Sequence, residues 1–196
     1  FTVQDDGGVA DGVGSALSGA LTITVTGVND VPTRTAGTVS NLTVLEDSGL
    51  TSLGLDALAY DPGGGTDEDT QTLAYAVTAV PAASLCDVVL ANGTTVVSAG
   101  TYLLAQIQGM QFRTAADANG GPATFSFTVQ DDGGTADSGV DTLTESLNIS
   151  VTAANDAPTI SGTPDTGGVQ GDAYSLTPPA NDLDGDTLTF SITNPP

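Results

Sequence analysis

The chain has 196 residues and a formal net charge of −22, because 24 acidic residues stand against only two basic ones, Arg34 and Arg113. Since it has no histidine and no lysine, it cannot build a Ser-His-Asp or Cys-His nucleophilic site, offer an imidazole to zinc, or form a Schiff base. Two arginines neutralise few phosphates, which excludes nucleic acid as a partner and disfavours insertion into anionic membranes.

The first feature along the chain is an internal repeat. Residues 1–33 recur without a gap as residues 127–159, an offset of 127 − 1 = 126 residues, and 19 of the 33 positions are identical. Such a period marks a repeat architecture. We therefore expect the last strands of a truncated repeat in residues 1-31, one complete repeat in residues 32-157, and the N-terminal part of a following repeat in residues 158-196.

Within the complete repeat, alternating apolar and polar residues indicate β-strands. The predicted strands span residues 38–45, 50–60, 71–80, 86–98, 103–113, 123–130 and 143–153. The fourth is expected to turn as a hairpin at Asn92-Gly93, and no segment shows a helical stripe. About seven strands in a domain of this size predict an all-β fold, an Ig-like Greek-key β-sandwich in tandem. The single Cys86 excludes an internal disulfide and is predicted to be buried.

Acidic residues gather in the loops between these strands and in the two linkers. If successive strands run antiparallel, the loops after the second and sixth strands meet the first linker at one end of the sandwich. The loops after the first and fifth strands meet the second linker at the other end. The predicted ligands at the first end are Asn29, Asp30, Asp67, Asp69 and Asp131. Those predicted at the second end are Glu46, Asn155, Asp156, Asp184 and Asp186.

The two ends are expected to lie roughly 27–34 Å apart, the length of a strand of eight to ten residues. Further polar residues of the same loops stand outside the predicted ligand set: Asp61, Glu68 and Asp132 at the first end, and Asp47, Asp117, Asn119 and Asp182 at the second.

Calcium is the cation that such clusters predict, because Ca²⁺ prefers six to eight carboxylate and carbonyl oxygens. Without a cation, clustered carboxylates repel one another or take up protons. Two alternatives stay open at this point. The charge can serve a solvated surface, and the loops can be ordinary Asp/Asn/Gly turns. The motif NDLDGD is similar to the start of an EF-hand loop, but the bidentate glutamate and the flanking helices are missing.

The order of these motifs resembles the cadherin superfamily, in particular the cadherin-like tandem repeats of giant bacterial surface proteins and adhesins. Glu46 in TVLEDSG resembles the base glutamate, and Asp67 and Asp69 in DEDTQTLAYAV resemble the Asp-x-Asp motif. Asp131 in FTVQDDGG is similar to the acidic end of the late strand. The last unit, from PTISGTPDTGG onward, resembles the shorter Ig-like, dystroglycan-type cadherin repeat.

The linker TAANDAPT, with Asn155 and Asp156, resembles the cadherin linker, from which it departs at Ala153 and Ala157. The resemblance, with these departures, implies two calcium ions at each junction rather than three. It also implies a secreted or cell-surface protein whose partners are calcium, neighbouring repeats and other copies of the protein.

The sequence therefore predicts a non-enzymatic, calcium-binding structural segment of a large extracellular adhesin, matrix or filament protein. The alternatives are a β-sandwich that binds carbohydrate, such as cell-surface glycans, or a spacer attached to an enzyme elsewhere in the protein. Five per cent aromatic residues and no tryptophan disfavour a sugar platform. A glycosidase-like pair of carboxylates is disfavoured for the same reason.

Overall fold

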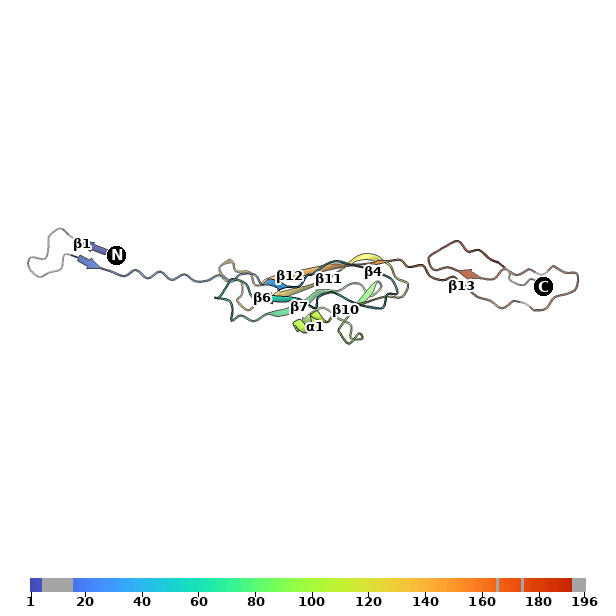
Figure 1. The fold of residues 1–196 in the computed structure, drawn as a ribbon, viewed down its shortest axis with the longest axis horizontal. Helices are drawn as coiled ribbons and strands as arrows, with labels where there is room; N and C mark the ends of the chain where they lie inside the picture. The colour runs from blue at the N-terminus through green and yellow to red at the C-terminus, as the bar shows by residue number, and fades with distance from the viewer. Residues whose placement is uncertain (5–15, 165, 174, 192–196) are drawn as a thin grey trace, which may run out of the picture.

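The computed structural model describes residues 1–4, 16–164, 166–173 and 175–191. Figure 1 shows an elongated molecule with a β-sandwich at its centre. A hairpin of β1 (Thr2–Gln4) and β2 (Ala16–Ser18) lies at one end, joined to the sandwich by an extended segment. A second small pair, β13 (Thr159–Ile160) and β14 (Ala180–Asn181), lies at the other end.

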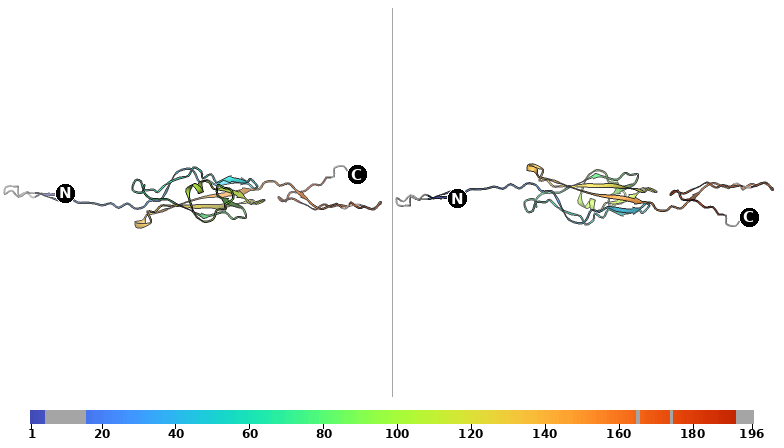
Figure 2. Two further views of the ribbon diagram at one scale, coloured as in Figure 1. Left: turned by 90° about the horizontal axis from the view of Figure 1, so that it is seen from below. Right: turned by 90° about the horizontal axis from the view of Figure 1, so that it is seen from above.

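Two main sheets form the central sandwich. The five-stranded sheet has the order β4-β12-β11-β7-β9, formed by Leu42–Leu45, Thr142–Thr152, Gly120–Gln130, Ala74–Ala79 and Gly100–Tyr102. The three-stranded sheet has the order β5-β10-β8, formed by Leu50–Ser52, Gln111–Thr114 and Cys86–Val89. A separate pair joins β3 (Thr33–Ala36) to β6 (Ala59–Asp61). Figure 2 shows the same narrow sandwich from two further sides.

The core lies between the two main sheets. Phe125 and Phe127 of β11 and Leu147 and Ile149 of β12 alternate with more exposed neighbours and are at most 1% exposed. They belong to one apolar cluster with Phe112 of β10 and with the buried Cys86 of β8. This period of two is the pattern from which strands were expected. The all-β class is confirmed.

The repeat in the sequence is also a repeat in strand pairing. In the hairpin β1–β2, Thr2 pairs with Ser18 and Gln4 with Ala16. Residues 126 positions later pair in the same register in β11–β12, where Thr128 faces Thr144 and Gln130 faces Thr142. Likewise, Thr33 of β3 pairs with Asp61, and its equivalent Thr159 of β13 pairs with Asn181. The same local architecture therefore surrounds both linkers.

Two predicted strands are interrupted. The strand expected over residues 50–60 is divided into β5 and β6, because the turn between them turns Leu53, Leu55 and Leu58 into the core, where each is at most 2% exposed. Of the strand expected over residues 38–45, only the last four residues form a strand, β4, and an unpredicted strand, β3, ends just before a break that begins at Gly37. Gly37 has φ +76°, and a β-carbon there would lie 2.7 Å from the backbone of Ala57. This break allows β3 to pair with β6 and β4 to pair, in parallel, with β12.

The strand predicted over residues 103–113 is wrong in its first half. A short helix, α1 (Leu104–Gln108), precedes β10. The backbone N–H of Leu103 donates to Gln106 Oε1 at 2.9 Å, which satisfies one amide at the start of the helix. Ile107 and Met110, three residues apart, are fully buried. That spacing fits a helix, whereas Leu103, Ala105 and Ile107 alternate as in a strand, so this short segment matches both periods.

The hairpin turn after β8 was predicted, whereas one short strand was not. The hairpin turn at Asn92-Gly93 is confirmed, because Leu90 N–H donates to the Thr95 carbonyl and Val89 pairs with Val96. The short strand β9 was not predicted. Within the described residues, no helix is long and apolar enough to cross a membrane.

A matched pair of variants tests where the core lies. Phe127 is fully buried, whereas Phe1, its equivalent 126 residues earlier, is 77% exposed. We expect Phe127→Ala to lower the free energy of unfolding by about 3–5 kcal/mol and Phe1→Ala to change it by less than about 0.5 kcal/mol. Urea denaturation followed by circular dichroism measures both, and equal losses for the two variants would contradict this core.

Candidate metal centres

Polar side chains gather at both ends of the sandwich, where the linkers meet its loops. The N-terminal junction comprises Asn29, Asp30, Asp67, Glu68, Gln71 and Asp131. The C-terminal junction comprises Glu46, Asp47, Asp117, Asn119, Asp156 and Asp184. Strand β11 runs from Gly120, beside the C-terminal junction, to Gln130, beside the N-terminal junction. Its eleven residues correspond to roughly 35 Å, which places the two junctions at opposite ends of the sandwich as expected.

Glu46 is the buried centre of the C-terminal junction. It is 4% exposed and follows directly after β4. Its Oε1 accepts the N–H of Ala154 at 2.8 Å, and its Oε2 accepts Asn119 Nδ2 at 3.2 Å. Glu46 N–H also donates to the Thr152 carbonyl at 2.9 Å. The glutamate therefore fastens the second linker to the unit that precedes it.

Asp156 joins the second linker to the unit that follows. Its N–H donates to Asp184 Oδ2 at 2.6 Å. The Asp184 loop is itself folded by Asp182 Oδ1, which accepts the N–H groups of Asp184 and Asp186 at 3.1 and 3.0 Å. The second linker is thus held by one carboxylate from each unit. The two linker amides that donate to them, of Ala154 and Asp156, are two residues apart.

Two groups of three carboxylates meet at this junction and share Asp156. One consists of Glu46, Asp156 and Asp184, the other of Asp47, Asp117 and Asp156. In each group the nearest oxygens lie within 4.8 Å of one another. Two oxygens bound to one calcium ion at about 2.4 Å are at most about 4.8 Å apart, so each group has the spacing of a metal site.

The crowding of carboxylates at this junction affects the pKa of Asp156. Removal of water by its neighbours raises its pKa most, and the surrounding carboxylates raise it further, in the order Asp117, Asp184, Asp47 and Glu46. Both causes disfavour the charged form. A bound cation would offset the repulsion between the carboxylates and so favour the charged form of Asp156.

Asn29 holds the N-terminal junction together. Its Nδ2 donates to Asp131 Oδ1 at 3.0 Å and to the Val140 carbonyl at 2.9 Å, while its Oδ1 accepts Gln71 Nε2 at 2.7 Å. Beside it, Asp30 N–H donates to Glu68 Oε1 at 2.8 Å. This last contact matches that of Asp156 N–H with Asp184, 126 residues after Asp30.

Three buried oxygens at the N-terminal junction lack a hydrogen-bond donor within the described part of the chain. They are Glu68 Oε2, Gln71 Oε1 and Asp131 Oδ2. Glu68 is 3% exposed and Asp131 is 5% exposed. Buried carboxylate oxygens without a partner are costly. A cation is the kind of partner that such oxygens need.

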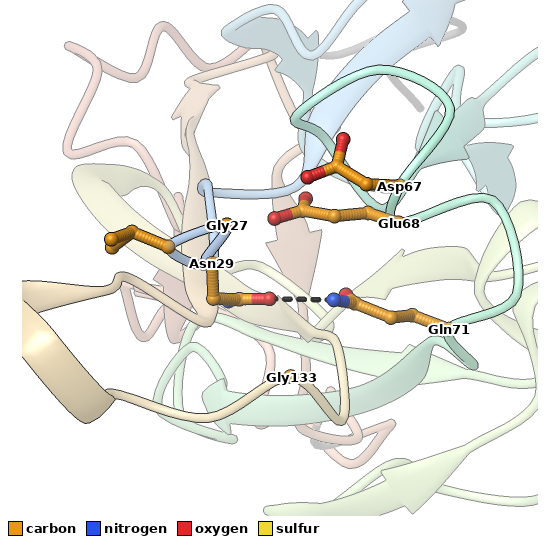
Figure 3. A pocket seen from close by; sticks show the side chains of 7 residues that line it. Gly27, Asn29, Asp67, Glu68, Gln71 and Gly133 are labelled. Carbon is orange, nitrogen blue, oxygen red and sulfur yellow. Dashed lines mark hydrogen bonds between the residues drawn. The ribbon is translucent and has the colours of Figure 1, made fainter. Parts of the chain in front are cut away.

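Figure 3 shows a hollow that is lined by two of these residues, Glu68 and Gln71. Asp67, Glu68 and Gln71 reach toward it from the loop between β6 and β7, and the first linker and Gly133 form its other side. Its volume is about 290 Å³. The carboxylate of Asp67 lies against the linker, since a β-carbon on Gly27 would be 2.7 Å from Asp67 Oδ2.

Neither arginine balances the charge at the junctions. Arg34 Nε lies 3.5 Å from Glu145 Oε1, and Arg113 Nη2 lies 3.3 Å from Asp87 Oδ2. Both ion pairs are formed on strands of the sandwich. Because the sequence has no other basic side chain, a cation that neutralises the junctions has to come from solution.

The structure brings most of the predicted site residues together. At the N-terminal junction it joins Asn29, Asp30, Asp67 and Asp131, and at the C-terminal junction Glu46, Asp156 and Asp184. Asn155 lies in the second linker, where its amide donates to the carbonyl of Asp156 at 3.0 Å. Asp69 and Asp186 are exposed, and their carboxylates make no contact with a linker among the interactions of the described residues.

Five residues outside the predicted ligand set take part as well: Glu68 and Gln71 at the N-terminal junction, and Asp47, Asp117 and Asn119 at the C-terminal one. The equivalence of the two linkers could have indicated Glu68. Its carboxylate accepts the N–H of Asp30, just as the carboxylate of Asp184 accepts the N–H of the equivalent residue, Asp156. No sequence signal marked Gln71.

Comparison of the chain with protein-family models, with curated proteins and with solved structures finds no match.

The raised pKa of Asp156 predicts how pH affects the metal-free chain. A raised folded pKa means that folding favours the protonated form, so this contribution to stability is present at low pH and is lost as pH rises through the folded pKa. In EDTA at pH 7, we expect Asp156→Asn to melt at a higher temperature than the native chain. The difference should shrink toward about pH 4, near the ordinary aspartate pKa. A variant that melts lower than the native chain at pH 7 in EDTA would contradict this account.

Proposed function

We propose that the chain is a structural segment of an extracellular array of β-sandwich repeats, in which calcium ions fix the angle between successive units. In this proposal the segment has no catalytic role. Its partners are Ca²⁺, the neighbouring repeats and other copies of the protein in an adhesin, matrix or filament. The proposal covers both junctions, with the C-terminal one as its main support.

The single observation that carries the proposal is the group Glu46, Asp156 and Asp184. These residues come from the sandwich, the linker and the following unit, and their oxygens lie within 4.8 Å of one another. One ion bound by all three would connect the two units directly. A surface that is acidic only for solubility has no reason to concentrate carboxylates at the point where two units meet.

The strand arrangement supports an Ig-like or cadherin-like Greek key in tandem. The first part of the complete repeat changes sheets, since β3 pairs with β6 and β4 pairs in parallel with β12. Sheet neighbours are far apart in sequence, as in β5-β10-β8, which is the mark of crossover connections in sandwiches. The matching register of β1–β2 and β11–β12 supports the tandem arrangement.

Calcium fits the donor atoms better than other common ions. The groups offer carboxylate oxygens and neighbouring amide and backbone oxygens, with no imidazole in the chain and the only thiol, Cys86, buried in the core. Hard oxygen ligands favour Ca²⁺ or Mg²⁺ over zinc and copper. Several carboxylates around one ion favour Ca²⁺, because Mg²⁺ usually keeps much of its water.

Calcium is therefore expected to stabilise the folded chain. A ligand that binds only the folded state adds about 2.7 kcal/mol at a hundredfold excess over its Kd. We expect the melting temperature to rise with calcium and to fall again with EDTA, as measured by scanning calorimetry. A melting temperature that is the same in both buffers would contradict the proposal.

Glu46→Gln tests the C-terminal site with little change of shape. Glutamine retains an oxygen that accepts the Ala154 N–H but loses the charge that attracts the ion. Calcium affinity should therefore fall at least about tenfold, which corresponds to about 1.4 kcal/mol. Asp69→Asn removes one charge from an exposed loop residue and is the matched control. Calorimetric titration should show weaker binding for Glu46→Gln only; equal effects of the two substitutions would indicate unspecific attraction by net charge.

A further inference from the structure

The first linker is fastened to the sandwich by uncharged groups as well as by acids. Asn29 and Val140 form a reciprocal pair in which Asn29 Nδ2 donates to the Val140 carbonyl and Val140 N–H donates to the Asn29 carbonyl, both at 2.9 Å. Gln71 Nε2 donates to Asn29 Oδ1 at 2.7 Å (Figure 3). With the bond to Asp131 Oδ1, Asn29 contacts the loops on both sides of the sandwich end.

Glycines make room for this side chain. A β-carbon on Gly133 would overlap the amide of Asn29, and one on Gly139 would lie 3.0 Å from Asn29 Cβ. Gly133 lies in an exposed part of the loop after β11, and its φ is outside the left-handed region that favours glycine. Its lack of a side chain is therefore explained by the space that Asn29 fills, and not by the backbone conformation.

We propose that Asn29, seated between Gln71 and Gly133, is a metal-independent latch that fixes the first linker to the sandwich. Both polar ends of its amide are used by hydrogen bonds. Its oxygen accepts the Gln71 amide, a contact that needs no ion. In the latch, Asn29 and Gln71 position the linker, and the carboxylates of Glu68 and Asp131 remain for a cation.

The second linker provides an internal comparison. Asn155 stands 126 residues after Asn29, yet among the described residues its amide donates only to the carbonyl of its neighbour Asp156. The loop of residues 182–186, DLDGD, which faces this linker, has no amide side chain that corresponds to Gln71. Asn155→Ala is thus a control that makes the same chemical change where the structure shows no latch.

Amide hydrogen exchange in EDTA tests the latch without reference to calcium. The N–H groups of Asp30 and Val140 report on it, since they donate to Glu68 Oε1 and to the Asn29 carbonyl. We expect both to be protected in the metal-free native chain. Asn29→Ala and Gly133→Ala should each reduce this protection at least about tenfold, as expected for the loss of several hydrogen bonds. Amides of β11 and β12 should stay protected, which shows that the sandwich remains folded.

Asn155→Ala and Gly168→Ala should leave the protection of Asp30 and Val140 unchanged. Gly168 is a suitable control because, apart from its chain neighbours, no atom of the described residues lies within 4 Å of the position of its missing β-carbon. Protection of Asp30 and Val140 that appears only when calcium is added would overturn the latch, and so would unchanged protection in Asn29→Ala. Because the assay is run in EDTA, failure of the proposed calcium function would leave its result unaffected.

Discussion

The carboxylates at the two ends of the sandwich have no positive partner in the protein, and this constraint shapes both junctions. Of the two arginines, one pairs with Glu145 and the other with Asp87, so neither contacts the junctions. At the C-terminal junction, removal of water and then the repulsion of neighbouring carboxylates raise the pKa of Asp156. At the N-terminal junction, buried oxygens of Glu68 and Asp131 have no donor among the described residues. In the proposed function, a divalent cation would relieve both conditions and would fix the second linker as a spacer between units.

The two junctions combine charge and hydrogen bonding in different proportions. At the N-terminal junction Asn29 already satisfies its own amide and one oxygen of Asp131. At the C-terminal junction the linker is held mainly through acceptors that are charged, Glu46 and Asp184. On this account the first linker keeps its position without metal, and the second depends on the ion to offset the repulsion of its carboxylates. A chain with both kinds of junction would bend at defined points when calcium is withdrawn.

The long, regular strands could be predicted from the sequence, and so could the two ends of the sandwich at which the acidic loops meet. The strands β7, β11 and β12 lie within or close to their predicted ranges, because their alternating residues face one core and water. The division of residues 50–60 was not predicted, because Leu53 and Leu55 alternate as in a strand; only Leu58, three residues after Leu55, departs from that period, and all three are buried in the turn. The Leu104–Gln108 helix was hidden because so few residues do not distinguish the two periods.

For the junctions, the loops were predictable and the particular side chains were not. Asp67, Glu68 and Asp69 are consecutive, and only backbone geometry decides that Glu68 is buried while Asp69 is exposed. Asp47 and Asp117 were named in the correct loops but were left out of the ligand set. Gln71 was missed because its role depends on Asn29, 42 residues earlier. Motif order thus indicates which loops meet, whereas three-dimensional packing selects the side chains.

The most direct test of the account is the distance between the central sandwich and the following unit, with and without calcium. Spin labels on cysteines introduced at the exposed positions Ala83 and Thr163 report this distance by electron–electron double resonance. The native Cys86 is buried, and burial raises the pKa of its thiol, so it is expected to react slowly with the label. The account predicts a narrow distance distribution in calcium and a broad one in EDTA. Distributions of equal width in the two buffers would contradict it.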